Sequence, residues 1–188
     1  MNKPEGYDDI NINSNGRLAP GGHRCIVIKV LEGKSSTGKE QLEIWLDTAG
    51  DDPQPSFFSN QYMNNTSETK KWPCRFWITG YETDDYGKRN LKKFHTALED
   101  SNANFSISWG PAYASSIQGK RIGCVFREEE NEWNGRISTL IKPYYFRNVM
   151  KIFDEPVPEK KTLAKTVTAT GNEDFMQVGL GDEGLPFR

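Results

Sequence analysis

Short apolar runs separated by turn-forming residues constrain the fold of this chain more than any other feature of its sequence. Residues 25–31 form a β-branched run, residues 33–39 have the composition of a turn, and residues 42–46 form a second run. Two such runs around a turn predict a β-hairpin. Further strands are predicted over residues 72–79, 122–126 and 136–141, the last continuing past a proline to residue 147. The acidic stretch 128–132 would form the turn between the last two strands.

One segment breaks this β pattern. Leu91, Phe94, Ala97 and Leu98 recur at helical spacing, so they predict a single amphipathic helix over residues 91–98. The order of three strands, one helix and two strands is that of an OB-fold, a five-stranded and partly open Greek-key barrel. We therefore predict an all-β domain with one helix, an OB-fold, over residues 21–153, after an extended segment at residues 1–20. Other small barrels stay open as alternatives.

The C-terminal part of the chain has a different composition. Residues 154–161 alternate prolines with charged residues, and the stretch from there to Gly181 contains few aliphatic side chains and no periodicity. A segment of this kind cannot offset its ordering entropy by burial. The sequence therefore predicts a disordered tail over residues 154–188.

The tip of this tail carries two apolar side chains that would bury nothing within the chain. Leu185 and Phe187 flank Pro186, which restricts the backbone and lowers the entropy lost on docking. Asp182 and Glu183 would favour a partner pocket with a basic rim. These five residues predict a protein-docking peptide; the alternative is a chance pair of apolar residues at a frayed terminus.

The composition excludes some classes of protein. The 188 residues include 24 Lys or Arg and 26 Asp or Glu, a net charge of -2, so a uniformly basic nucleic-acid binder is excluded. No apolar run approaches the about 20 residues that span a membrane, and residues 1–18 lack the apolar core of a signal peptide. Cys25, Cys74 and Cys124 lie in apolar runs without a CxxC motif, which predicts buried free thiols in a reducing cytoplasm.

Sequence signals for catalysis are weak. Residues 33–40 nearly match a phosphate-binding loop, but Glu40 stands where the motif needs Ser or Thr, and a strand follows instead of a helix. His23 and His95 are far apart, without the spacing of metal ligands. We therefore predict a protein that is not an enzyme and uses no cofactor. A metal-dependent nuclease or other DNA-processing enzyme stays open as an alternative, because distant carboxylates can converge in a fold.

Basic residues interleaved with aromatic ones are the positive functional signal. Residues 70–93 contain seven Lys or Arg against three acidic residues, a local net charge of +4. Binding of single-stranded nucleic acid requires cations along the phosphate backbone and aromatic faces on which bases stack, at about 1–3 kcal/mol per base. The candidate DNA-binding residues are Lys34, Lys39, Lys70, Lys71, Trp72, Arg75, Trp77, Lys120, Arg121, Arg136, Lys142, Tyr144 and Arg147. Trp72 and Trp77 are five positions apart in one predicted strand, so they should face opposite sides.

Several segments resemble a family of small proteins encoded in the replication and recombination modules of phages and prophages of Gram-positive bacteria. The resemblance rests on residues 94–102 and 119–130, and also on residues 58–62 and 71–73. It covers about residues 21–153 and implies binding of single-stranded DNA in the cytoplasm of a bacterial host.

The C-terminus is similar to that of bacterial single-stranded DNA-binding proteins, which end in an acidic run that closes on Pro-Phe. Residues 182–187 follow this pattern, with a shorter acidic run and with Arg188 after the phenylalanine. This resemblance implies that the tip recruits host or phage replication and recombination proteins, while Arg188 argues against tight binding in the usual partner pocket.

Together these signals predict non-catalytic, sequence-tolerant binding of single-stranded DNA in phage DNA replication or recombination. A barrel-type adaptor that contacts only proteins is a further alternative. The sequence leaves the oligomeric state open, a homo-oligomer included.

Overall fold

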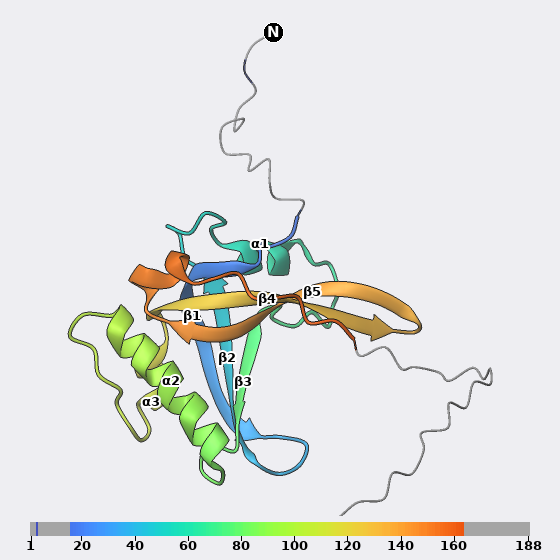
Figure 1. Ribbon diagram of the computed structural model, residues 1–188. Helices are drawn as coiled ribbons and strands as arrows, with labels where there is room; N and C mark the ends of the chain where they lie inside the picture. The colour runs from blue at the N-terminus through green and yellow to red at the C-terminus, as the bar shows by residue number, and fades with distance from the viewer. Residues whose placement is uncertain (1–2, 4–15, 164–188) are drawn as a thin grey trace, which may run out of the picture.

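Five strands form one antiparallel sheet in the order β3-β2-β1-β4-β5 (Figure 1). The computed structural model describes residue 3 and residues 16–163. The strands are β1 (Gly21–Lys34), β2 (Glu40–Thr48), β3 (Arg75–Thr79), β4 (Arg121–Trp133) and β5 (Arg136–Arg147). The helices are α1 (Phe57–Asn64), α2 (Asp85–Ser101), α3 (Tyr113–Ile117) and the 3-10 helix η2 (Val149–Asp154). The predicted β-rich domain is confirmed, but it carries α1 and α3 besides the single helix that the sequence predicted.

Strand β1 is shared between two partners. Its residues Gly21 to Ile26 pair with β4, and its residues from Cys25 to Lys34 pair with β2. The pairing with β2 shifts register just after Val27, as at a β-bulge, which bends a strand and increases its twist. The sheet therefore bends at β1. The pairing of β1 with β2 confirms the predicted hairpin.

The sheet curls until its two edge strands approach each other. Phe76 on β3 and Phe146 on β5 have ring centroids 4.8 Å apart, with their planes at 69°. Side chains from the strands and α2 fill the space that the curled sheet encloses, among them Val27, Ile44, Leu46, Phe94, Leu98, Ile122 and Phe126. The three cysteines are buried and free, as predicted.

Helix α2 contains the predicted helical segment and extends it in both directions. It begins after Asp84, whose carboxylate accepts a hydrogen bond of 2.6 Å from the N–H of Gly87 and so caps the helix. A Cβ atom on Gly87 would lie 2.4 Å from the carbonyl carbon of Gly80, so this first turn requires glycine. Phe94 and Leu98 are fully buried, and α2 packs against β3, β4 and β5.

The acidic stretch 128–132 lies within β4, so the predicted acidic turn is wrong. The chain reverses instead at Asn134 and Gly135, between β4 and β5. Both residues have positive φ, 50° and 72°, which is the geometry of the two-residue hairpin turn that Asn-Gly favours. Neighbouring cations pair with two of these glutamates: Lys142 Nζ lies 3.3 Å from Glu129 Oε2, and Lys160 Nζ lies 3.0 Å from Glu130 Oε1.

The beginning of the predicted tail is ordered along β4. Strand β4 continues past its last partner on β1, and Lys161 forms a bridge with the main-chain groups left there. The N–H of Lys161 donates to the carbonyl oxygen of Glu128, and the N–H of Glu130 donates to that of Lys161, both at 2.9 Å. The prediction of disorder from Asp154 onward is therefore wrong for residues 154–163, because an open strand edge offers them hydrogen-bond partners. Residues 164–188 lie outside the described part.

The predicted N-terminal boundary also shifts. Leu18 is 3% exposed and belongs to the core, and the N–H of Ala19 donates to Gln54 Oε1 at 2.8 Å. The domain therefore starts a few residues before Gly21. Across the residues that the structure describes, no helix has the length and apolar character needed to cross a membrane.

Candidate nucleic-acid interface

The face of β1, β2 and β3 that points away from the core is open to solvent. On β2, Leu42, Ile44 and Leu46 are buried, while Glu43 and Trp45 between them are partly exposed, because successive side chains of a strand point to opposite faces. We call this open side the outer face. Its residues are Lys29, Leu31, Gly33, Gln41, Glu43, Trp45, Arg75, Trp77 and Thr79.

The strand register aligns these side chains in rows across the three strands. Lys29 of β1 lies opposite Trp45 of β2, which lies opposite Arg75 of β3. Each cation lies near a ring: Lys29 Nζ is 5.2 Å from the centroid of Trp45, and Arg75 Cζ is 5.0 Å from that of Trp77. Cations and aromatic rings are therefore neighbours on one surface, within the range of cation–π attraction.

A row of three aromatic rings continues the outer face toward α1. Trp72 lies parallel to Trp45, with an interplanar angle of 2° and a centroid distance of 5.9 Å, and Tyr62 follows at 5.4 Å from Trp72. Lys70 Nζ lies 4.6 Å from the Tyr62 ring. The indole N–H of Trp72 donates to the carbonyl oxygen of Leu46 at 2.9 Å, which holds the middle ring in place.

A buried carboxylate on β2 positions α1 and hence Tyr62. Asp47 Oδ1 accepts hydrogen bonds from the main-chain N–H groups of Phe58, at 2.9 Å, and Ser59, at 3.3 Å. Its other oxygen accepts a hydrogen bond from the Ser59 hydroxyl. A carboxylate at a helix N-terminus satisfies free N–H groups and complements the helix dipole. This contact explains why a short apolar segment forms a helix beside the outer face.

Glu43 is the acidic residue of the outer face, and it orients two of its neighbours. Its Oε1 atom accepts a hydrogen bond of 2.9 Å from the indole N–H of Trp45 and one of 3.3 Å from the guanidinium of Arg75. The pair of Arg75 and Glu43 is partly exposed, so it contributes little to stability. Its main effect is to hold the tryptophan and the arginine in fixed orientations.

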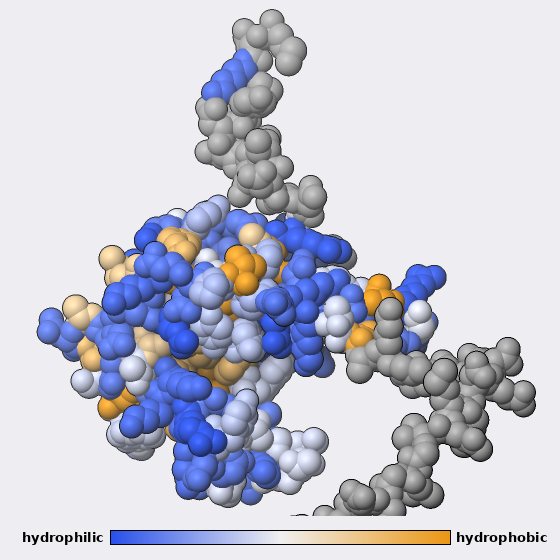
Figure 2. Space-filling model, in the orientation of Figure 1, coloured by the Kyte–Doolittle hydropathy of each residue, from blue (hydrophilic) through white to orange (hydrophobic). Residues whose placement is uncertain are grey.

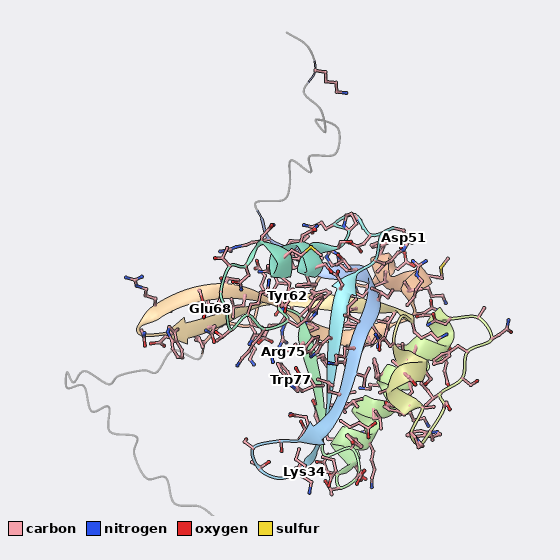
Figure 3. The ribbon with its side chains drawn as sticks, turned by 180° about the vertical axis from the view of Figure 1, so that it is seen from behind. Lys34, Asp51, Tyr62, Glu68, Arg75 and Trp77 are labelled. Carbon is pink, nitrogen blue, oxygen red and sulfur yellow. The ribbon has the colours of Figure 1, made fainter. Side chains whose placement is uncertain are left out.

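The structure brings four of the predicted DNA-binding residues onto this surface or to its margin: Lys70, Trp72, Arg75 and Trp77. Lys71, which lies between Lys70 and Trp72 in the sequence, is exposed. Figure 3 shows Tyr62, Arg75, Trp77 and Lys34 following one another from α1 to the turn between β1 and β2. Lys34 therefore lies at the end of β1 next to this turn, beyond the last residues of the outer face. The two long hairpins, β1–β2 and β4–β5, project on this side of the molecule in Figures 1 and 3, with the outer face between them.

The hairpin of β4 and β5 carries three further predicted residues. Arg136 is exposed beside the Asn-Gly turn, and Lys142 pairs with Glu129. Tyr144 is 44% exposed, and Arg127 lies 4.0 Å above its ring. Burial alone would raise the pKa of Glu129, but hydrogen bonds from Arg127 and Lys142 outweigh it and hold the pKa below its ordinary value. The glutamate therefore stays ionised and neutralises part of the positive charge of this hairpin.

Four predicted residues have partners away from the outer face. Lys39 pairs with Asp84 at 3.3 Å, Lys120 lies 4.6 Å above Phe105, and Arg147 pairs with Glu155 at 3.1 Å. Arg121 binds both carboxylate oxygens of Asp51, at 2.7 and 2.6 Å, and this hydrogen bonding lowers the pKa of Asp51.

The sequence prediction missed three residues of this surface: Lys29, Trp45 and Tyr62. The alternation of residues 42–46 could have placed Trp45 on the exposed side of its strand. The prediction that Trp72 and Trp77 face opposite sides is wrong. Strand β3 begins only at Arg75, so strand alternation does not extend to Trp72. The Trp72 ring lies parallel to that of Trp45 on the outer face and also packs against the hydrophobic core.

No cluster of three or more His, Cys, Asp or Glu side chains that could hold a metal ion occurs in the described part of the chain. The predicted docking residues Asp182, Glu183, Leu185, Pro186 and Phe187 lie outside the described residues. No protein-family model matches this chain, and no curated protein matches it either.

Proposed function

We propose that this protein binds single-stranded DNA on the outer face, without catalysis and with little dependence on base sequence. One observation carries the proposal: Lys29, Trp45 and Arg75 form a row across three strands, between Trp77 on one side and the neighbouring rings of Trp72 and Tyr62 on the other. Aromatic faces accept any base by stacking, and the cations attract the phosphates between the bases.

We further propose that the domain is an OB-fold. Three features support this: β1 pairs with both β2 and β4, the main helix α2 lies between β3 and β4 in the chain, and the edge strands β3 and β5 meet through Phe76 and Phe146. OB-folds bind oligonucleotides on the face of their second and third strands, between the loops that join strands 1–2 and 4–5. The outer face occupies the corresponding position, between the hairpins β1–β2 and β4–β5.

Open rings favour single strands over duplex DNA. Stacking on Trp77 requires an unpaired base, because the bases of a duplex already stack on one another. Within the described residues, α2 is the longest helix, and it covers the core instead of projecting as a helix that could enter a major groove. Affinity should therefore come from stacking and from phosphate contacts.

The proposed role in phage replication or recombination, and recruitment of partners through residues 182–187, rest on the sequence resemblances. The nuclease and the protein adaptor remain the competing proposals. All three differ in what they do to an oligonucleotide, so one set of binding and cleavage measurements separates them.

The test is fluorescence anisotropy of a labelled oligothymidylate and of a duplex of equal length, with the full-length protein. We expect tighter binding to the single strand, with log K falling as log salt rises by about 0.7 per phosphate contact. Arg75→Ala should weaken binding by about 1–2 kcal/mol, or about 5- to 30-fold, while Lys151→Ala on η2 serves as the matched control.

Three results would contradict the proposal. Equal affinity for duplex would remove the case for base stacking. Mg²⁺-dependent shortening of the oligonucleotide would favour the nuclease. No binding at low salt, by a protein whose unfolding transition is intact, would favour the adaptor.

A further inference from the structure

A groove separates α2 from β5 on the side of the molecule away from the outer face. Two adjoining hollows, of about 370 and about 290 Å³, form it. Lys93 of α2 and Phe146 and Arg147 of β5 line both hollows, so the two are continuous. The binding proposal for the outer face does not use this groove.

The rim of the groove on α2 is a row of cations. Arg89, Lys92 and Lys93 line it, and none of them forms an ion pair with any residue in the described part of the chain. Arg89 and Lys93 are four positions apart, so they are neighbours on the helix surface. Asp100 is the acidic residue of the lining. Figure 2 shows the surface over α2 as strongly hydrophilic.

Aromatic rings form the floor of the groove and lie on both of its rims. Phe76 and Phe146 close the floor where the edge strands meet. Tyr86 of α2 is 70% exposed, Tyr144 of β5 is 44% exposed, and both line the same hollow. A row of cations beside partly exposed aromatic rings repeats the chemistry of the outer face, down to the guanidinium of Arg127 over Tyr144.

The groove adjoins the outer face across a single strand. Phe76 in the floor is the neighbour in sequence of Arg75 and Trp77, which lie on the outer face of β3. Strand β3 is an edge strand, so no further strand separates the two surfaces there. An extended polyanion that follows the outer face reaches the groove by crossing the edge of β3.

We infer that single-stranded DNA continues from the outer face over the edge of β3 into the groove between α2 and β5. This inference rests on the proposed function and lengthens its binding path. Arg89, Lys92 and Lys93 contact phosphates, and Tyr86 and Tyr144 offer faces for bases. The occupant is a nucleic acid and not an acidic protein segment, because the groove continues the outer face and presents exposed rings on both rims.

The test measures affinity against oligonucleotide length. Oligothymidylates from about 4 to about 24 nucleotides bracket the about 4–16 nucleotides that one OB-type domain covers. The triple variant Arg89→Ala, Lys92→Ala, Lys93→Ala changes exposed positions of α2 to the best helix former, so the helix persists. A charge-preserving variant, Arg89→Lys, Lys92→Arg, Lys93→Arg, is the matched control.

We expect the triple alanine variant to bind the shortest oligonucleotides like the wild type. On the longest ones it should bind at least about tenfold more weakly, with a salt slope reduced by about 2, the sum for three phosphate contacts on a single strand. The charge-preserving control should keep the wild-type affinity at both lengths.

Equal affinities of wild type and triple alanine variant for long oligonucleotides would overturn the inference. A peptide of residues 182–188 that binds the wild type and not the variant, with DNA affinity unchanged, would assign the groove to an acidic protein segment instead. If the wild type binds no oligonucleotide of any length, the proposed function itself fails. If only the groove inference fails, the triple alanine variant binds oligonucleotides of every length like the wild type, and Arg75→Ala still weakens that binding.

Discussion

Trp77 provides the sharpest test of base stacking on the outer face. Its side chain is 45% exposed, and the structure places the guanidinium of Arg75 5.0 Å from its ring centroid. It lies on the face of β3 opposite to the buried Ile78. Replacing Trp77 by alanine therefore removes an accessible ring and little of the core.

The expected loss of affinity is much larger than the loss of stability. Removal of one stacking platform costs about 1–3 kcal/mol per base, or about 5- to 150-fold in affinity. Stability should change by less than about 1 kcal/mol, the span of β-propensity in a strand. Trp77→Phe keeps a ring and should retain most of the affinity.

Trp72 gives the opposite pattern and serves as the comparison. Its alanine variant loses the hydrogen bond of 2.9 Å to Leu46 and the contacts with Trp45 and Tyr62. We expect this variant to lose about 2–3 kcal/mol of unfolding free energy, because the ring is partly buried. Its affinity for DNA also falls, since Trp45 and Tyr62 lose their common neighbour.

The assay combines anisotropy of a labelled oligothymidylate with urea unfolding of each variant. Base stacking on Trp77 is refuted if Trp77→Ala binds as tightly as the wild type while its unfolding midpoint is unchanged. It also fails if Trp77→Ala and Trp72→Ala lose stability equally, because the ring at position 77 would then belong to the core.

Three further predictions concern stability. Gly22→Ala should destabilise the domain by about 3 kcal/mol or more in urea unfolding, because its Cβ would lie 1.9 Å from the carbonyl oxygen of Ile152; an unchanged midpoint would contradict this contact. The hydrogen bond from the N–H of Gly87, helped by Lys39, lowers the pKa of Asp84 below its ordinary value of 3.8. The stability that the Asp84 carboxylate supplies is therefore fully present above pH 3.8 and is lost as the pH falls through the lower pKa of the folded state. Asp84→Asn should therefore make the melting temperature, monitored by circular dichroism, less sensitive to acid. An identical dependence of the melting temperature on pH in wild type and variant would refute this. Truncation after residue 159 should lower the melting temperature by about 2–4 °C relative to truncation after residue 163, since only the shorter chain leaves the edge of β4 open; equal melting temperatures would show that this edge needs no cover.

Local pattern alone was sufficient for the β1–β2 hairpin and for the centre of α2. Residues 25–31 and 42–46 are apolar runs on either side of a turn, and Leu91, Phe94 and Leu98 repeat at helical spacing. The density of cations and aromatics in residues 70–77 likewise singled out Arg75 and Trp77, which the structure places side by side on the outer face. These features depend on residues that are close together in the sequence, so they can be predicted from the sequence alone.

Contacts between distant segments decided the rest. Helix α1 forms where Asp47, from another element, accepts hydrogen bonds from its first N–H groups. The acidic stretch 128–132 remains a strand because β5 pairs with it, and residues 155–163 are ordered because β4 extends past β1. The row of Lys29, Trp45 and Arg75 exists only through the register of three strands. A sequence specifies the side chains, but strand register and edge exposure, which only the tertiary structure decides, determine which of them share a surface.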